Sequence, residues 1–362
     1  MKYAKKLFAV LLSVLLIAAA FAGCSASGKD SGGSTSGKKV AILQYMPHSS
    51  LDNCTQGVKN ALDAAGIAYD VQIGSSGSAD TDCQSYAEQM ASSGNYSAII
   101  AVATPAAVSA YSAVRNASSD IPVIFCAVSD PVSAGLVNSL DAPGNNCTGT
   151  ADAVDIAGQV QLIKTMQPNI KNLGVIYTTT EANSISQLAT LKAECEANGI
   201  NLVQKGINEA SELQAVALSL VNEVDAITNL TDNNVVDNMS VVLEQANQKG
   251  IPIYGSEIEQ VKKGCLASAS IDYVALGEKT GQIAVDVLGG KSAATYPVVT
   301  VSDSTGWIYD PEGIDVALLK EVKEVKRARL TEYAAAKSSA EYHAKQNGEH
   351  GVWQYKVDLA LP

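Results

Sequence analysis

The stretch KVAILQY at residues 39–45 has a counterpart in KNLGVIY at residues 171–177, and this pair decides the fold. Each run is apolar and is followed by a loop, a helical pattern and a Gly-Ile pair, at residues 66–67 and again at residues 199–200. Ile42 and Val175 are 133 residues apart, and so are Gly66 and Gly199. The chain repeats a single supersecondary plan twice.

A second echo extends the repeat, because IPVI at residues 121–124 matches IPIY at residues 251–254. Short apolar runs between turn residues predict buried parallel strands. The first helix is expected to begin at Ser49 or Ser50 and to end before Gly66. Alternating strands and helices predict a parallel sheet covered on both faces. The predicted fold class is α/β, with two doubly wound parallel-sheet lobes joined by hinge crossovers.

Lobe boundaries follow from the repeat. The N-terminal lobe is expected at residues 38–150 plus 274–310, and the C-terminal lobe at residues 151–273. Residues 147–154 are expected to link the lobes and residues 263–273 to cross back, so that the helical pattern Tyr273–Leu288 returns to the first lobe. In open α/β sheets, ligands bind at the carboxyl ends of the strands. Two facing lobes therefore predict a ligand cleft that closes about a hinge.

The N-terminus carries three lysines within its first six residues and then an apolar stretch too short to span a membrane. Residues 1–23 are predicted to be a lipoprotein signal peptide, because small residues precede Cys24 as in a bacterial lipobox. Residues 24–37 would be the lipidated cysteine and a Gly/Ser tether. The expected location is the outer face of the bacterial cytoplasmic membrane. An ordinary signal peptide with an incidental cysteine is the alternative.

Composition excludes several functions. The net charge of −12 disfavours nucleic-acid binding. Three arginines exclude a multi-arginine phosphate clamp, and His48 as the only histidine before residue 343 excludes a multi-histidine metal site there. Apart from Cys24, the six cysteines include no C-x-x-C pair, so most are expected to be small buried residues. No cofactor or metal is expected.

The loops after the predicted strands are rich in hydroxyls, amides and carboxylates. Thr104, Ser184 and Asn233 each precede or open a helical pattern, where free backbone N–H groups favour an anion. Asp130 or Asp232 is expected to accept from an ammonium group, so the set suits a zwitterion. Tyr45, Met46, Pro47, Leu51 and Tyr177 are candidates for an apolar pocket wall. Helix capping, and a simple Asp130-Pro131 turn, remain alternatives.

Four sequence runs in and around these loops resemble the corresponding runs of one protein family. They are AVATPAA at residues 101–107, IPVIF with AVSDPVSAGLV within residues 121–137, EANS at residues 181–184, and TDN at residues 231–233. The resemblance covers roughly residues 39–309 and is to substrate-binding lipoproteins of ABC importers of the tryptophan/tyrosine-transport type, which have a type I periplasmic-binding-protein fold.

That resemblance implies capture of a small ligand, with aromatic amino acids favoured, and delivery to a membrane permease with its ATPase. The ligand contacts carried by the matching motifs are Thr104, Pro105, Ala106, Asp130, Asn183, Ser184, Asp232 and Asn233. The remaining candidates come from the strand-end loops and are Tyr45, Leu51, Ser129, Tyr177, Glu181 and Ser256. The first loop, residues 44–52, and the last, residues 255–258, depart from the family.

Two other functions stay open: the same fold binding a sugar or signalling ligand, and an enzyme with Asp130 and Asp232 as acid and base. No nucleophile–histidine constellation, G-x-G-x-x-G turn or Walker motif supports an enzyme, so none is expected. Residues 311–362 form a tail of uncertain structure, and residues 316–362 do not resemble the family. A docked helix, a disordered extension and a shifted reading frame are its open alternatives.

Overall fold

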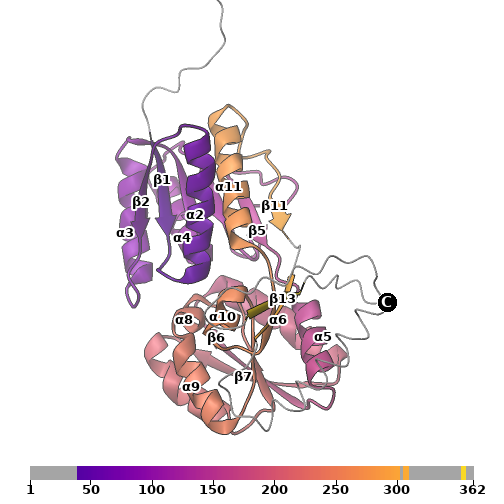
Figure 1. Cartoon of the computed structure of the whole chain (residues 1–362). Helices are drawn as coiled ribbons and strands as arrows, with labels where there is room; N and C mark the ends of the chain where they lie inside the picture. Colours follow the sequence, from indigo (N-terminus) through magenta and orange to yellow (C-terminus); the bar gives the residue numbers. More distant parts are fainter. Residues whose placement is uncertain (1–38, 302–304, 310–351, 356–362) are drawn as a thin grey trace, which may run out of the picture. The chain divides into compact units, whose positions relative to one another are not determined.

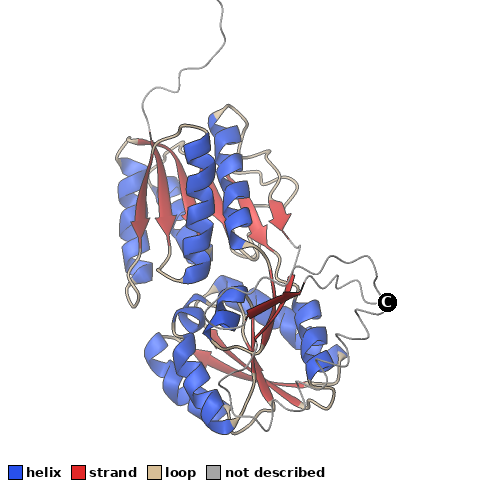
Figure 2. Ribbon diagram, viewed as in Figure 1, coloured by secondary structure: helices blue, strands red, loops and turns tan. Residues whose placement is uncertain are grey.

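The computed structural model describes residues 39–301, 305–309 and 352–355. The predicted signal peptide and tether lie outside the described residues, as does the predicted tail except for residues 352–355. Both lobes belong to one compact unit that begins at Lys38. Each lobe has its own helix-covered parallel sheet (Figures 1 and 2), which confirms the predicted fold class. Among the described helices, none combines the length and the apolar character needed to cross a bilayer.

The first lobe has a sheet in the order β11-β5-β4-β3-β1-β2, with every pair parallel. Its central strand β1 places Ile42 opposite both Val71 and Ile100. Helices α2 and α11 cover one face and α3 and α4 the other, so the side chains of the four inner strands β1, β3, β4 and β5 are mostly buried. The elements are β1 (Lys39–Gln44), α2 (Ser49–Ala64), β2 (Tyr69–Ile73), α3 (Ala79–Ser92), β3 (Tyr96–Val102), α4 (Thr104–Asn116), β4 (Val123–Cys126), β5 (Cys147–Asp152), α11 (Tyr273–Leu288) and β11 (Val299–Val301).

The second lobe repeats that plan, since β7-β6-β8-β9-β10 has the same order as β2-β1-β3-β4-β5. One apolar cluster lies under α5 and α6 and another under α7 and α9, so both faces of this sheet are covered too. The elements are α5 (Ile156–Met166), β6 (Asn172–Thr178), α6 (Ala182–Ala197), β7 (Asn201–Ile207), η2 (Ala210–Glu212), α7 (Leu213–Leu220), β8 (Ala226–Thr228), α8 (Asn233–Asp237), α9 (Met239–Lys249), β9 (Ile253–Gly255), α10 (Ile258–Lys263), β10 (Ala267–Ser270), β12 (Thr305–Tyr309) and β13 (Val352–Tyr355).

Helix ends follow local chemistry in both halves. Gly66 after α2 and Gly199 after α6 adopt positive φ angles of 67° and 69°, the left-handed conformation that ends a helix without steric cost for glycine. In the second lobe Asp155 caps α5, with its side chain accepting from the Gly158 N–H at 2.7 Å. The six cysteines within residues 39–301 are buried with free thiols.

The chain crosses between lobes at two places. The segment expected to be only a link is a buried strand, β5, which ends at Asp152 before α5 begins in the other lobe. After β10 the chain returns, and α11 lies against α2 although more than 200 residues separate them (Figure 1). Residues 305–309 differ from the expectation for residues 274–310, because β12 pairs antiparallel with β10 of the second sheet. The edge of strand β10 would otherwise leave its backbone N–H and C=O groups unpaired, and β12 pairs with them.

Candidate functional site

A cavity lies at the carboxyl ends of strands from both sheets, the position that open α/β sheets use for ligands. Its volume of about 30 Å³ accommodates water-sized groups only, so its walls must part to admit anything larger. The lining residues are His48, Ser50, Leu51, Ala103, Thr104, Ala127, Ser129, Asp152 and Tyr273 from the first lobe, and Asn183, Thr231, Asn233, Val236 and Glu257 from the second.

Five buried polar atoms of the lining residues have no hydrogen-bond partner. They are His48 Nδ1, Thr104 Oγ1, Asp152 Oδ1, Asn183 Oδ1 and Glu257 Oε1. Buried polar atoms in folded proteins nearly always have a hydrogen-bond partner, so a bound ligand is expected to supply one to each of these atoms. Their convergence on one cavity, from both lobes, gives a ligand several hydrogen-bond partners at once.

The start of α4 supplies the part of the cavity suited to an anion. Thr104 is 2% exposed, and the N–H groups that precede the first helical hydrogen bond point from this helix end. The preceding residue, Ala103, has φ 81°, and Ala127 after β4 has φ 55°. Positive φ angles strain a residue that carries a Cβ, and such strain gathers at functional sites. Both strained alanines line the cavity.

Asp152 ends β5 and is 2% exposed. Burial raises the pKa of its carboxyl group to about 7, against the partial opposition of the Ser129 and Tyr273 hydroxyls. A carboxyl group with a pKa of about 7 is roughly half protonated at neutral pH. A cationic ligand group beside it would therefore strongly favour the ionised form.

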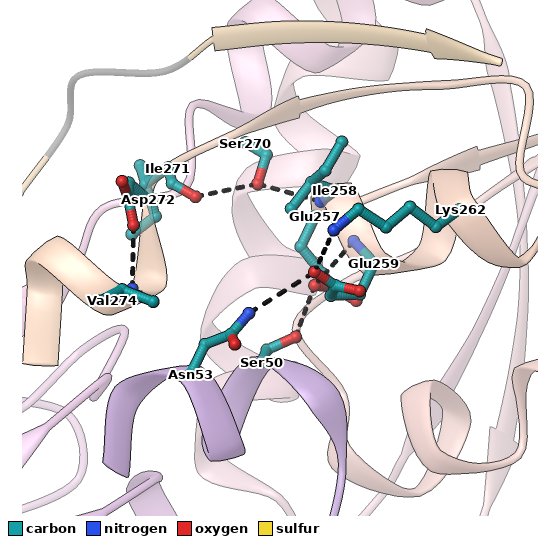
Figure 3. A network of polar contacts seen from close by, with 10 residues as sticks. All are labelled: Ser50, Asn53, Glu257, Ile258, Glu259, Lys262, Ser270, Ile271, Asp272 and Val274. Carbon is teal, nitrogen blue, oxygen red and sulfur yellow. Dashed lines mark hydrogen bonds and ion pairs between the residues drawn. The ribbon is translucent and has the colours of Figure 1, made fainter. Parts of the chain in front are cut away.

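Glu257 follows β9 in the second lobe and is also 2% exposed. Its Oε2 accepts from the Ser50 hydroxyl of α2 at 2.5 Å and from the Glu259 N–H at 3.2 Å (Figure 3). Burial raises the pKa of Glu257 to about 6, with the Ser50 hydrogen bond working in the opposite direction. The Ser50–Glu257 bond therefore joins a helix start of one lobe to a strand-end loop of the other.

Other hydrogen bonds join the same two rims. His48 Nε2 lies 3.2 Å from Asn233 Oδ1, and burial lowers the pKa of His48, which favours its neutral form. Ser129 and Thr231 pair through their hydroxyls at 3.2 Å. The Ser186 hydroxyl donates to Asp130 Oδ2 at 2.7 Å. Hydroxyl, amide and imidazole groups thus contact the opposite lobe around the cavity, either by pairing with one another or by approaching a carboxylate.

Behind the second-lobe rim lies a carboxylate pair, Glu181 and Asp232. Asp232 accepts from the backbone and hydroxyl of Thr178, from the Ser184 hydroxyl and from the Val235 N–H, and so caps α8. Glu181 accepts from the side-chain amides of two lining residues, Asn183 and Asn233. Burial and the neighbouring Asp232 raise the pKa of Glu181 well above its usual range. The pair holds the two asparagines in place.

The structure places the fourteen candidates from the sequence in two groups. Those that line the cavity are Leu51, Thr104, Ser129, Asn183 and Asn233. Those that lie outside the lining are Tyr45, Pro105, Ala106, Asp130, Tyr177, Glu181, Ser184, Asp232 and Ser256. Pro105 and Ala106 continue α4, and Tyr177 lies partly buried beside the second-lobe core.

Intraprotein hydrogen bonds occupy several candidates of the second group. The Tyr45 hydroxyl donates to Asp80 Oδ1 at 2.9 Å, and the Ser256 hydroxyl donates to the Leu230 carbonyl at 2.8 Å. Asp130 accepts from the Ser133 backbone and hydroxyl. Although burial acts against it, these bonds and that of Ser186 lower the pKa of Asp130.

Sequence reasoning missed five polar lining residues, which are His48, Ser50, Asp152, Thr231 and Glu257. Asp152 ends a strand, and the other four lie in the loop or helix start that follows one, which is the signal that the sequence offers. Asp152 ends the polar run CTGTAD, which has the composition of a link between lobes, and Glu257 stands beside Ser256 in a loop that offers both a carboxylate and a hydroxyl.

Comparison with known proteins identifies the family to which residues 39–310 are similar. The family model for the ABC transporter substrate binding protein matches residues 39–310. The chain is 37% identical to the Tyrosine-binding protein of Clostridioides difficile over 313 residues, covering 83% of this chain and 89% of that protein. A solved ABC domain from Streptococcus pneumoniae in complex with L-Trp has a TM-score of 0.71 at 30% identity, covering 80% of this chain and 95% of that one.

A second similarity concerns the C-terminal part. The family model for Glutamate/Leucine/Phenylalanine/Valine dehydrogenase matches residues 266–362 and so overlaps the first match. The NADP-specific glutamate dehydrogenase of Helicobacter pylori is 34% identical over 146 residues, which cover 40% of this chain but only 31% of that enzyme. The tail that departs from the substrate-binding family is thus similar to a part of these dehydrogenases.

Proposed function

Because the chain belongs to the family of ABC transporter substrate-binding proteins, we propose that it captures an aromatic amino acid, tyrosine or tryptophan, in the cavity between its lobes. Proteins of this family work outside the cytoplasm and serve an ABC transporter. The observation that carries the proposal is the set of five unpartnered polar atoms at the strand ends of both lobes. The relatives that bind tyrosine and L-Trp support the aromatic class.

The ligand carboxylate is assigned to the start of α4. The Thr104 hydroxyl and the free N–H groups of this helix end can donate to an anion, which the helix dipole also favours. No lysine or arginine is present among the residues that line the cavity. Backbone and hydroxyl donors must therefore hold the carboxylate. Leu51 and Tyr273 are available to contact the aromatic side chain.

Delivery to a permease, powered by a separate ATPase subunit, completes the proposed function. Cys24 is proposed to carry the lipid that keeps the protein at the outer face of the cytoplasmic membrane. The anchor is tested by expressing the full chain and Cys24→Ser in a lipoprotein-processing bacterium fed a labelled fatty acid. The full chain should be labelled and should sediment with membranes, and Cys24→Ser should lose the label. A label retained by Cys24→Ser would contradict the anchor.

Ligand capture is tested by isothermal titration of the chain from residue 25 onward with L-tyrosine, L-tryptophan, the other amino acids and common sugars. Tyrosine or tryptophan is expected to bind with the lowest Kd. At 100 times Kd the ligand should raise the free energy of unfolding by ~2.7 kcal/mol, seen as a higher Tm. Binding of sugars alone would contradict the amino-acid proposal.

A further inference from the structure

The cavity has an acidic side. Asp152 and Glu257 are the two carboxyl groups among the lining residues, and no lysine or arginine lines the cavity to neutralise them. Both are 2% exposed, so neither is solvated by bulk water. A buried carboxylate without a cationic partner is costly, and its cost falls when a cation is brought to it.

Each of the two carboxyl groups has an oxygen available. Asp152 Oδ1 and Glu257 Oε1 are buried and without a hydrogen-bond partner, whereas Glu257 Oε2 is engaged by Ser50 and Glu259. An ammonium group has three N–H donors and no acceptor. Two acceptor-only oxygens facing one cavity match that donor set.

The two carboxyl groups come from different lobes but line the same cavity of about 30 Å³. Both raise the pKa of Tyr273, which opens α11, and both raise the pKa of Cys54 on α2. In each case burial is the larger cause, and the two carboxylates act in the same direction. One small cationic group can reach both.

The carboxylates expected from the sequence to hold the ammonium group are already engaged. Both oxygens of Asp232 accept two hydrogen bonds each, from Thr178, Ser184 and Val235. Asp130 accepts from Ser133 through both oxygens and from Ser186. Neither residue lines the cavity. The available acceptors are therefore those of Asp152 and Glu257.

We propose that Asp152 of the first lobe and Glu257 of the second together bind the ammonium group of the ligand. This assignment rests on the proposed function and names the part of the site that selects an amine-bearing ligand. The two carboxylates come from different lobes, so the bound ammonium group draws both lobes to one point. Asp152 also ends β5, where the chain crosses to the second lobe, so the contact lies beside a hinge.

Proton release follows from this arrangement. The groups that face Asp152 are the hydroxyls of Ser129 and Tyr273 and the thiol of Cys54. Those that face Glu257 are Ser50, Glu259, Lys263 and the thiol of Cys265, besides Cys54 and Tyr273. Because Asp152 has a pKa of about 7, an ammonium group that binds at pH 7 should expel roughly half a proton from it. Affinity should rise with pH between 5 and 8.

The experiment titrates the chain from residue 25 onward with L-tyrosine and with 3-(4-hydroxyphenyl)propanoate, which lacks only the amino group. In the unmodified protein the analogue should bind at least ~100-fold more weakly, as expected for the loss of charge-assisted bonds. Asp152→Asn and Glu257→Gln should each shrink this ratio by roughly tenfold, by weakening tyrosine and not the analogue. Comparing buffers of different ionisation enthalpy should show proton release for tyrosine only.

Glu223→Gln is the matched control, because it removes a second-lobe carboxylate that does not line the cavity and pairs with Lys205 at 2.8 Å. It should keep the ratio of the unmodified protein. An unchanged ratio in Asp152→Asn and Glu257→Gln, with Tm showing that both fold, would overturn this assignment and leave the proposed function intact. Binding of neither tyrosine nor tryptophan by the unmodified chain would overturn the proposed function and the assignment with it.

Discussion

Replacing Thr104 by Val separates the role of the site from the stability of the fold. Valine keeps the shape of threonine but removes the hydroxyl, whose oxygen is buried and unpartnered. An unsatisfied buried polar group costs ~1–3 kcal/mol, so its removal should raise the free energy of unfolding by about 1 kcal/mol. A carboxylate ligand would lose a charge-assisted hydrogen bond of ~1.5–3 kcal/mol, which is about 10- to 150-fold in Kd.

Urea unfolding without ligand measures the first quantity, and isothermal titration with L-tyrosine measures the second. Thr55→Val is the matched control, since the buried Thr55 hydroxyl donates to Gln44 Oε1 at 2.6 Å and does not line the cavity. It should lower the free energy of unfolding by ~1–2 kcal/mol and leave Kd unchanged. If Thr104→Val destabilises the protein like Thr55→Val while Kd stays constant, Thr104 belongs to the fold and the carboxylate assignment is refuted.

Two further outcomes concern the first lobe. Gly277→Ala should lower the free energy of unfolding by at least ~1–3 kcal/mol, because a Cβ would lie 2.0 Å from the Cys54 carbonyl oxygen where α11 meets α2. Urea unfolding of the variant and of the unmodified chain measures this loss. Between pH 4 and pH 7 the Asp152 carboxyl group keeps its proton in the folded chain, where its pKa is about 7, but loses it in the unfolded chain, where its pKa is near 3.8. The unmodified chain therefore loses stability as pH rises through this range, and Asp152→Asn should become more stable than it by up to roughly 4 kcal/mol. Equal pH profiles of the two proteins would contradict that pKa.

The repeat made the fold predictable. Ile42 and Val175 fall 133 residues apart and occupy corresponding central strands, β1 and β6, with neighbours in the same order. Apolar periodicity and the glycines at helix ends are local signals, so they survive without knowledge of the tertiary structure. The predicted fold class of two parallel-sheet α/β lobes is confirmed for this reason.

The candidate site was less predictable because burial and pairing are tertiary properties. Asp232 and Ser184 have the residue types of ligand contacts, but Thr178 on a neighbouring strand end brings them together in an internal network. The run CTGTAD of β5 is polar in sequence yet wholly buried, since Thr148 donates to the Tyr296 carbonyl and Thr150 pairs with Thr280. Those partners lie about 130–150 residues away in the chain, so no local pattern signals the strand that carries Asp152.

The unpartnered atoms also explain how ligand binding can be coupled to lobe closure. Contacts between the lobes, such as Ser50–Glu257 and His48–Asn233, already favour approach without ligand. The same approach buries five polar atoms that find no protein partner, and each costs ~1–3 kcal/mol. A shift from mostly open to mostly closed needs ~5.5 kcal/mol of differential affinity. A zwitterion whose carboxylate accepts from Thr104 and whose three N–H groups donate to three of the four acceptors satisfies four of these atoms. It removes a penalty of ~4–12 kcal/mol from the closed state alone, a range that includes the differential affinity that closure requires.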